Sequence, residues 1–588
     1  MSSNDLTIAI TGSGGDGVVT TGDLIAQACA KVGLNVIKTE AYGPQIRGGE
    51  SSCTVRISPE HLFAQADTVD LVVIFSWSDY GKFKSEIIPA DGAILLYEEA
   101  DPIPEGWELG RLNLIPIPFS QLAKDAGAPA GKNIMTLGLL GTLFGLPVDQ
   151  LRAAVMNKFA KKKEGVTETN LKAFEAGIEH AKTVTAVSAD SRLAYTPGAT
   201  KLLMSGNEAA AVAAVHAGCR FFAGYPITPS SEVLHYFSEV MPKIGGTVVQ
   251  TEDELSAIGA IIGGSFAGVK SMTATSGPGL SLMAEMLGLA SIAEIPIVIL
   301  NVQRGGPSTG NPTKSEQADL SHAIYASHGD TPRVVIAPSD VEDCFHATVD
   351  AFNIAEEFQI PVIILSDQLI GPRRETLDIA TLEHEVRDRL LPKDEAVEGG
   401  YRRYADTPNG VSPMAVPGLR HGIYQTNGLE HNEQGRPSSM YETHEHMNEK
   451  RYRKFAAIGE RYHFSRRYGP EKAKVGVVCW GSSKGAVKEA VTAANARGES
   501  VSAFVPQMIH PFPVKDFEAF RASVDRLLII ELSYGAQFYT YLRTLFDLPK
   551  ETTRLYKRSG VKHLTVTEVE HEIRKSMSTV TRPEEVLA

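Results

Sequence analysis

The chain has 588 residues, of which 43% are hydrophobic and 22% are charged. This composition is ordinary for globular proteins and excludes a fibrous or largely disordered chain. The length exceeds what one hydrophobic core normally serves, so we expect several domains. Lys and Arg number 57 against 70 Asp and Glu, a formal net charge of −13. The chain therefore lacks the basic field that nucleic acid or an anionic membrane would need, and we expect its partners to be proteins and small molecules.

The cysteines and the N-terminus indicate a cytoplasmic protein. The five cysteines lie far apart, at Cys29, Cys53, Cys219, Cys344 and Cys479, and none forms a Cys-x-x-Cys pair. We therefore expect reduced, buried thiols and neither a metal nor an iron–sulfur cluster on this chain. The first residues lack the basic start, apolar run and cleavage site of a signal peptide. No apolar run reaches the roughly 20 residues of a membrane span.

Short apolar runs alternate with helical segments in three parts of the chain. Residues 1–188 open as strand, glycine turn, helix and strand, and residues 200–372 repeat the alternation with at least six apolar runs. Residues 373–470 lose this pattern and indicate an extended connector. Residues 471–588 form a last α/β unit, whose ELSYGAQ strand end we expect to serve subunit contacts. The pattern predicts an α/β protein with several doubly wound, parallel-sheet domains.

A glycine turn follows the first predicted strand, at residues 12–17. It satisfies G-x-G-x-x-G, and Glu40 ends the next strand near the position of a ribose-binding acid, so a dinucleotide site is one interpretation. The others are a structural tight turn, a site for CoA phosphates and a contact with another subunit. Gly15-Asp16-Gly17 also imitates the start of the magnesium–diphosphate motif of thiamine enzymes. No Asn pair follows at the required distance, so we interpret this second match as accidental.

Four consecutive strands in residues 200–372 are followed by polar, glycine-rich loops. The loops are G-Y-P-I-T-P-S-S-E at 224–232, Q-T-E-D-E at 250–254, T-S-G-P-G at 275–279 and N-V-Q-R-G-G-P-S-T-G at 301–310. The carboxyl ends of parallel strands are where α/β sheets bind ligands. Taken singly, each loop also has a plain structural explanation as a helix cap, a favourable first-turn acid or a surface ion pair.

Glu254 starts a helix whose small residues, such as Gly259 and Gly263, would let it pack closely against a neighbour. A carboxylate there would be partly buried, and burial raises the pKa of a carboxyl group. Such an acid can share a proton with N1′ of an aminopyrimidine, so that the 4′-imine takes the C2 proton of a thiazolium, as thiamine chemistry requires. Arg304, on the fourth loop, could clamp a substrate carboxylate with two parallel hydrogen bonds.

Together, G-Y-P-I-T-P-S-S-E, E-D-E-L-S-A-I-G-A, T-S-G-P-G-L-S-L-M and Q-R-G-G-P-S-T-G closely resemble the alpha subunits of the 2-oxoacid:ferredoxin oxidoreductase family. G-S-G-G-D-G-V and residues 42–49 resemble the family's gamma domain, here fused at the N-terminus. Residues 471–588 are similar to the transketolase C-terminal-like domain. Asp16 departs from the family's usual Gln, and a carboxylate repels phosphate. The gamma–alpha fusion is typical of the two-subunit 2-oxoglutarate enzymes.

The resemblance implies a thiamine-diphosphate pyrimidine-binding fold for residues 200–372. It implies that Glu254 activates the aminopyrimidine, that Thr228 hydrogen-bonds the substrate or a thiamine intermediate, and that Arg304 binds a carboxylate. Further implied cofactor contacts are Tyr225, Pro226, Ile227, Ser230, Ser276 and Gly277, and candidate contacts for CoA or substrate are Gly14, Gly15 and Arg47.

The resemblance also implies a beta subunit that carries the magnesium–diphosphate motif and a 4Fe–4S cluster, in an (alpha–beta)2 heterotetramer. We expect reversible oxidative decarboxylation of a 2-oxoacid, with CoA as cosubstrate, ferredoxin as acceptor and 2-oxoglutarate to succinyl-CoA as the favoured reaction. Pyruvate, branched-chain 2-oxoacids and indolepyruvate remain alternatives, because side-chain specificity lies in loops. A dinucleotide-binding dehydrogenase built on the glycine turn and a non-catalytic scaffold are the rival classes.

Overall fold

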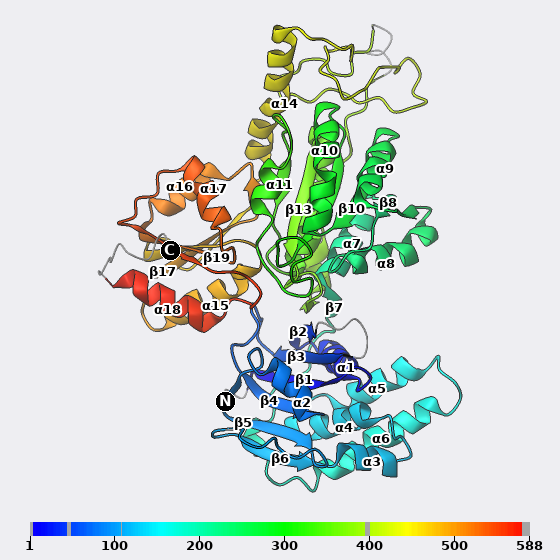
Figure 1. The fold of residues 1–588 in the computed structure, drawn as a ribbon, viewed down its shortest axis with the longest axis vertical. Helices are drawn as coiled ribbons and strands as arrows, with labels where there is room; N and C mark the ends of the chain where they lie inside the picture. The colour runs from blue at the N-terminus through cyan, green and yellow to red at the C-terminus, as the bar shows by residue number, and fades with distance from the viewer. Residues whose placement is uncertain (1–3, 44–48, 108, 394–399, 579–588) are drawn as a thin grey trace. The chain divides into compact units, whose positions relative to one another are not determined.

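The computed structural model describes residues 4–43, 49–107, 109–393 and 400–578. The chain divides into two compact units (Figure 1). Unit 1 consists of Met1–Ser205 and Arg373–Thr381, and unit 2 consists of Gly206–Pro372 and Leu382–Ala588. The N-terminal glycine turn therefore belongs to unit 1, and the four polar loops belong to unit 2.

Unit 1 contains an eight-stranded mixed sheet in the order β6-β5-β4-β1-β3-β2-β14-β7. Pairing is parallel from β6 to β1 and antiparallel from β1 to β7. The strands are β1 (Leu6–Ser13), β2 (Asn35–Tyr42), β3 (Glu50–Ser58), β4 (Val69–Ile74), β5 (Pro89–Glu98), β6 (Asn113–Ile117), β7 (Leu202–Ser205) and β14 (Arg374–Leu377). The helices are α1 (Val18–Lys31), α2 (Trp77–Phe83), α3 (Phe119–Asp125), α4 (Lys132–Phe144), α5 (Val148–Phe159) and α6 (Val166–Ala181). Helices α4 and α6 pack closely because a Cβ on Gly138 or Gly177 would collide with a backbone carbonyl of the other helix.

Two strands of unit 1 come from segments that the sequence pattern assigns elsewhere. Strand β7 falls in the expected second domain, residues 200–372, and β14 falls in the expected connector, residues 373–470. Strand β14 pairs with β2, where the N–H of Val36 donates to Oγ1 of Thr376 at 2.9 Å, and β7 pairs with β14. These boundaries differ because four-residue strands that return from a distant part of the chain leave no periodic signal of their own.

Unit 2 contains a seven-stranded sheet in the order β18-β12-β13-β11-β10-β8-β9, parallel except for β18. The strands are β8 (Phe221–Gly224), β9 (Thr247–Gln250), β10 (Ser271–Thr275), β11 (Ile297–Gln303), β12 (Val334–Ile336), β13 (Pro361–Asp367) and β18 (Met508–His510). Its helices are α7 (Gly206–His216), α8 (Ser231–Val240), α9 (Glu254–Phe266), α10 (Gly277–Ile292), α11 (Leu320–Tyr325) and α12 (Val341–Phe358). Every residue of β11 and β13 is buried, as expected for central parallel strands covered on both faces.

The C-terminal part of unit 2 forms a five-stranded sheet in the order β15-β17-β16-β19-β20. The strands are β15 (Ser465–Tyr468), β16 (Ala473–Val478), β17 (Val501–Pro506), β19 (Val524–Glu531) and β20 (Thr553–Lys557), and the helices are α15 (Lys484–Ala496), α16 (Val514–Arg521), α17 (Gln537–Leu545) and α18 (Val566–Met577). Strand β18 leaves this part and pairs with β12 of the seven-stranded sheet. Throughout the described residues, no helix has both the length and the apolar character needed to cross a membrane.

The expected connector is not extended throughout, because it ends in the 21-residue helix α14 (Tyr441–Arg461) (Figure 1). The ammonium groups of Lys450 and Lys454 on α14 lie 2.8 and 2.6 Å from the carboxylate of Glu294, which follows α10. All three side chains are buried. The polar composition that suggests a solvated linker thus includes charges paired inside the protein.

Candidate active site

The four polar loops emerge from one edge of the seven-stranded sheet. Gly224 at the end of β8 pairs with Gln250 at the end of β9, and Thr275 at the end of β10 pairs with Asn301 of β11. Parallel strands that end in register bring the loops that follow them together. The N–H of Thr251 donates to the carbonyl of Gly224 at 3.0 Å, which joins the first two loops directly.

Glu254 is the first residue of α9, and its side chain turns into the protein. The helix starts there because the Asp253 carboxylate caps it, accepting the N–H of Ser256 at 2.7 Å. Only 4% of Glu254 is exposed. Burial raises the pKa of the Glu254 carboxyl, although hydrogen bonds from its own backbone and from the Thr275 hydroxyl work in the opposite direction. The side chain is therefore a buried acid at a ligand-binding edge.

The burial of Glu254 depends on the T-S-G-P-G turn rather than on the small residues of its own helix. A Cβ on Gly279 would collide with the Glu254 carboxylate and the Thr275 hydroxyl. By contrast, Gly263 faces open space, and the nearest atom to a Cβ on Gly259 would be Cε of Met286 at 3.9 Å. Gly259 and Gly263 thus make no close approach within the described part of the chain, whereas Gly264 of the same helix does, because a Cβ there would lie 2.7 Å from the Ser271 hydroxyl. Glycine is required at position 279 because the acid occupies the space of a side chain.

Arg304 connects the fourth loop to the first. Its Nη1 donates a hydrogen bond to the backbone carbonyl of Thr228 at 2.7 Å. The residue is 7% exposed, and its buried Nε has no hydrogen-bond partner. Burial lowers the pKa of the Arg304 guanidinium, and the charge of Asp319 partly opposes that shift. The structure thus places Thr228 and Arg304 together, as expected for residues that serve one site.

The remaining predicted contacts fall into two groups. Tyr225, Pro226 and Thr228 are exposed on the first loop and Ile227 is half-buried. Ser230 and Ser276 are buried, and their hydroxyls donate to the carbonyls of Ile227 at 3.0 Å and of Val302 at 2.8 Å. The two serines stabilise the loops, whereas the side chains of the exposed group are accessible from solvent.

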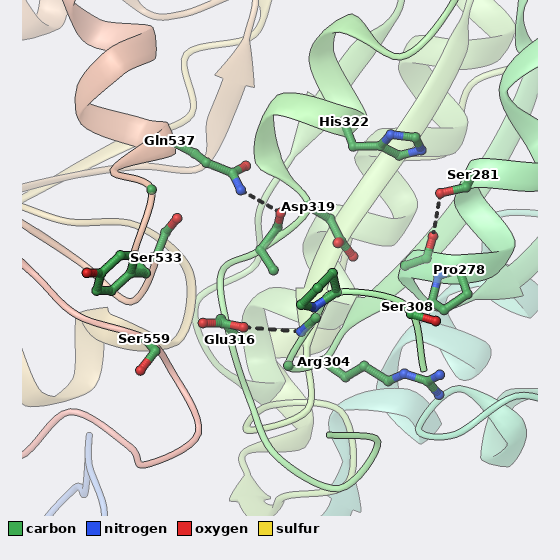
Figure 2. Close-up of a pocket in the computed structure, with 17 residues that line it drawn as sticks. Pro278, Ser281, Arg304, Ser308, Glu316, Asp319, His322, Ser533, Gln537 and Ser559 are labelled. Atoms are coloured by element: carbon green, nitrogen blue, oxygen red, sulfur yellow. Dashed lines mark hydrogen bonds between the residues drawn. The ribbon is translucent and has the colours of Figure 1, made fainter. Parts of the chain in front are cut away.

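A cavity of about 620 Å³ lies beside Arg304 (Figure 2). One wall comes from the start of α10, at Gly277, Pro278 and Ser281, and from the loop after β11. Side chains that sequence reasoning had not assigned to the site also line it, namely Glu316, Asp319, His322, Ser533, Tyr534, Gln537 and Ser559. Glu316, Asp319 and His322 follow the glycine-rich loop at 301–310 in the sequence. That position after a polar loop is the only sequence signal that could have pointed to them. The others lie in loops of the C-terminal part of unit 2 and at the start of α17, where we had expected subunit contacts.

Asp319 directly precedes α11 on the cavity wall, and its side chain reaches the first residue of α10. Its carboxylate oxygens both lie 3.0 Å from the position that a Cβ on Gly277 would take. The side chain accepts the Nδ2–H of Asn301 at 2.9 Å, and burial raises its pKa. Gly277 and Gly279 therefore each make room for a carboxylate, that of the half-buried Asp319 and that of the buried Glu254 respectively.

The glycine turn of unit 1 has its own acid. Oδ2 of Asp16 accepts the N–H of Ser13 at 2.9 Å, and Oδ1 of Asp16 lies 2.7 Å from Nζ of Lys132. The N–H of Gly14 donates to the carbonyl of Gly49 at 2.8 Å, and a Cβ on Gly15 would meet open space. Arg47 lies outside the described residues.

Glu40 was the candidate ribose-binding acid, and the five cysteines were expected to be reduced and to bind no metal. Glu40 accepts hydrogen bonds from Lys38 and Tyr42. All five cysteines are free and buried. Among the described residues, no group of three or more His, Cys, Asp and Glu side chains could hold a metal ion.

Three family descriptions match successive parts of the chain. Residues 7–180 match pyruvate ferredoxin/flavodoxin oxidoreductase, and residues 212–450 match the thiamine-diphosphate-binding part of pyruvate flavodoxin/ferredoxin oxidoreductase. Residues 473–569 match core domain II of pyruvate:ferredoxin oxidoreductase. The four polar loops all lie within the thiamine-diphosphate-binding match.

Individual relatives agree. The 2-oxoglutarate synthase subunit KorA of Methanothermobacter marburgensis is 39% identical over 58% of this chain and 90% of its own. Subunit alpha of 2-oxoacid:ferredoxin oxidoreductase 2 of Aeropyrum pernix is 30% identical over 92% of this chain and 93% of its own. A solved structure of 2-oxoglutarate:ferredoxin oxidoreductase from Magnetococcus marinus is 37% identical with a TM-score of 0.92, covering 98% of this chain and 100% of that one.

The chain therefore belongs to the 2-oxoacid:ferredoxin oxidoreductase family. Within that family it is an alpha subunit. Both the α/β class and the family predicted from the four motifs are confirmed.

Proposed function

We propose that this alpha subunit serves the reversible oxidative decarboxylation of 2-oxoglutarate. In this reaction 2-oxoglutarate, CoA and two oxidised ferredoxins give succinyl-CoA, CO2, a proton and two reduced ferredoxins. The single observation that carries the proposal is the buried Glu254 carboxyl against Gly279, at the same sheet edge as the Arg304–Thr228 hydrogen bond. The names of the relatives KorA and 2-oxoglutarate:ferredoxin oxidoreductase support this choice of substrate.

Thiamine diphosphate fits this edge, because its aminopyrimidine needs a buried acid at N1′ and Glu254 is one. When bound, the cofactor supplies the carbon nucleophile that attacks the keto carbon of the substrate. With the cofactor bound, Glu254 would hold the proton that N1′ shares, and burial, which raises the pKa of its carboxyl, favours the protonated form that this exchange requires. Arg304 binds the substrate carboxylate with the donors that its bond to Thr228 leaves over. Thr228 is exposed on the neighbouring loop, joined to Arg304 by that bond, and its hydroxyl would hydrogen-bond the substrate.

A beta subunit completes the site in this proposal. It brings Mg2+, the diphosphate-binding motif and the 4Fe–4S cluster, and two such pairs form an (alpha–beta)2 heterotetramer. The docking surface that we propose for it is the outer face of α9 and α10, where Leu255 and Leu282 are 42% and 46% exposed and Gly263 is open. An apolar face with small residues suits close helix packing across an interface.

The glycine turn of unit 1 is a poor dinucleotide site in its described conformation. Asp16 occupies the N–H of Ser13 and places a carboxylate where a phosphate would bind. Glu40, the candidate ribose acid, is already engaged by Lys38 and Tyr42. The same carboxylate disfavours a phosphate of CoA at this turn, so we propose that Gly14, Gly15 and Arg47 contact the substrate or a part of CoA other than its phosphates. The buried, free cysteines support a reducing, cytoplasmic location.

The substrate proposal is tested by assaying the purified alpha–beta pair with CoA and ferredoxin on a panel of 2-oxoacids. We expect the highest kcat/KM for 2-oxoglutarate. A higher kcat/KM for pyruvate, a branched-chain 2-oxoacid or indolepyruvate would replace the substrate while keeping the chemistry. A flavin or nicotinamide spectrum in the purified protein, without 2-oxoacid turnover, would contradict the proposal as a whole.

A further inference from the structure

The loop at residues 305–319 lies between two charged side chains that line the cavity, Arg304 and Asp319. Arg304 precedes it and Asp319 closes it, where the N–H of Asp319 donates to Oε1 of Gln303 at 3.0 Å. Within the loop, the N–H of Gly305 donates to the carbonyl of Lys314 at 2.9 Å, and the N–H of Asn311 donates to the carbonyl of Gly305 at 2.8 Å. These bonds give the loop a folded shape, but they fix only its first half and its last residue to the sheet.

The second half of the loop is held by the C-terminal sheet through Gln317. The N–H of Gln317 donates to the carbonyl of Leu532 at 2.9 Å, and the N–H of Leu532 donates back to Oε1 of Gln317 at 2.8 Å. The Nε2 of Gln317 donates to the carbonyl of Trp480 at 2.8 Å. Gln317 is fully buried, so these three bonds are shielded from water.

Gln537, the first residue of α17, makes a second connection next to Asp319. Its Nε2 donates to the carbonyl of Ala318 at 2.6 Å (Figure 2). Its Oε1 accepts the N–H of Ser321 at 2.8 Å. Glu316 adds a third connection, because its carboxylate accepts the N–H of Gly306 and the N–H of Gly560, each at 3.2 Å. The amide of Gln537 lies at the cavity wall with both ends engaged by backbone on either side of Asp319.

We propose that the C-terminal domain is a positioning element of the active site, with Gln537 as its principal positioning residue and Gln317 as its anchor. The two glutamines hold residues 316–321 at fixed places and thereby help set where Asp319, whose charge acts on Arg304, stands in the cavity. The domain therefore acts on substrate binding through the loop, without taking part in proton transfer. The role in substrate binding rests on the function proposed for Arg304, whereas the ordering of the loop does not.

The test uses the Gln537→Met variant of the full chain assembled with its beta partner. Methionine keeps the length of the side chain and removes both hydrogen bonds. We expect KM for the 2-oxoacid to rise about tenfold and kcat to change less than threefold. Thr544→Ala, on the exposed side of the same helix, is the matched control and leaves KM unchanged. An unchanged KM in Gln537→Met, or a fall in kcat alone, would overturn the role in substrate binding.

A second measurement does not depend on turnover. Amide hydrogen–deuterium exchange in the peptide covering residues 305–321 should accelerate at least threefold in Gln537→Met and stay unchanged in Thr544→Ala. Equal exchange in the two variants would overturn the inference even if the enzyme proves inactive on every 2-oxoacid. Conversely, a wild-type enzyme without 2-oxoacid activity but with the expected exchange difference would overturn the proposed function and leave the positioning of the loop intact.

Discussion

Nη1 of Arg304 donates a hydrogen bond to the backbone carbonyl of Thr228 at 2.7 Å, and this bond joins the loops that follow β11 and β8. The bond from Nη1 thus orients the guanidinium, while its other N–H donors stay available to a ligand. A lysine has a single ammonium and cannot reproduce this divided, planar geometry. The bond therefore predicts that Arg304 tolerates no other cation.

Arg304→Lys should raise KM for the 2-oxoacid by roughly 10- to 100-fold, since loss of a charge-assisted hydrogen bond costs about 1.5–3 kcal/mol. Steady-state kinetics of the assembled enzyme measure this directly. Arg543→Lys, on the exposed side of α17, provides a charge-conserving control with unchanged KM. A near-normal KM in Arg304→Lys would show that the guanidinium does not bind the substrate.

Gly279→Ala should lower both stability and activity. The added Cβ would collide with the Glu254 carboxylate and the Thr275 hydroxyl, and overpacking of this kind costs about 1–3 kcal/mol. Gly263→Ala is the matched control, because a Cβ there meets open space in the same unit and a helical Gly→Ala change stabilises by about 0.5–1 kcal/mol. Urea unfolding of the isolated chain should move the midpoint in opposite directions for the two variants. A midpoint that rises in both would contradict the close contact between Gly279 and Glu254.

Glu294→Gln should destabilise the chain by about 3–5 kcal/mol, because it leaves the buried ammonium groups of Lys450 and Lys454 without a counter-charge. Burial alone would raise the pKa of Glu294, but the charges of Lys450, Lys454 and Arg403 outweigh it and hold the pKa below its ordinary range. The pair therefore stabilises the protein at neutral pH and loses that contribution as the pH falls and the carboxylate takes up a proton. Glu239→Gln, which breaks the exposed pair with Lys243, should change stability by less than about 1 kcal/mol. Equal effects in denaturant unfolding would contradict this assignment.

For Glu531 we expect the free energy of unfolding to change with pH in the opposite direction. Burial raises the pKa of its carboxyl from 4.5 to about 7, even though the carboxylate accepts the N–H groups of Phe538 and Tyr539, both at 2.9 Å. The folded state thus binds the proton more tightly than the unfolded state, so stability falls as the pH rises from about 4.5 to about 7. Glu531→Gln should remove that slope, a difference on the order of 3 kcal/mol across the window. Parallel slopes of unfolding free energy against pH in the two proteins would disprove the shift.

Much of the fold and part of the site could be predicted from the sequence, because they depend on local patterns. Apolar runs and glycine turns mark the parallel strands and their carboxyl ends, so Thr228, Glu254 and Arg304 could be placed at one edge. The burial of Glu254 was expected for a different reason. Its cause is Gly279, which lies on another loop, and no spacing along α9 reveals that contact.

The remaining features of the site and of the sheets depend on contacts between segments that are far apart in the sequence. Such contacts leave no periodic pattern of apolar residues. Asp319 reaches the cavity because the loop at 305–319 folds back onto Gln303, and Gln537 reaches it from helix α17 in the C-terminal part of unit 2. Strand β14 belongs to the sheet of unit 1, although in the sequence it follows six of the seven strands of the other sheet, all except β18. Such long-range contacts come from tertiary packing, which local sequence patterns do not reveal.

The central claim is that Glu254 is the acid that activates the cofactor, and one substitution tests it most directly. Glu254→Gln in the assembled enzyme keeps the size of the side chain and removes its ability to exchange a proton. We predict that the alpha–beta complex still forms, with an unchanged elution volume on size-exclusion chromatography, and that kcat falls at least 100-fold. Glu252→Gln, two residues earlier on the exposed part of the same loop, should retain normal turnover. Full turnover in Glu254→Gln would contradict the account.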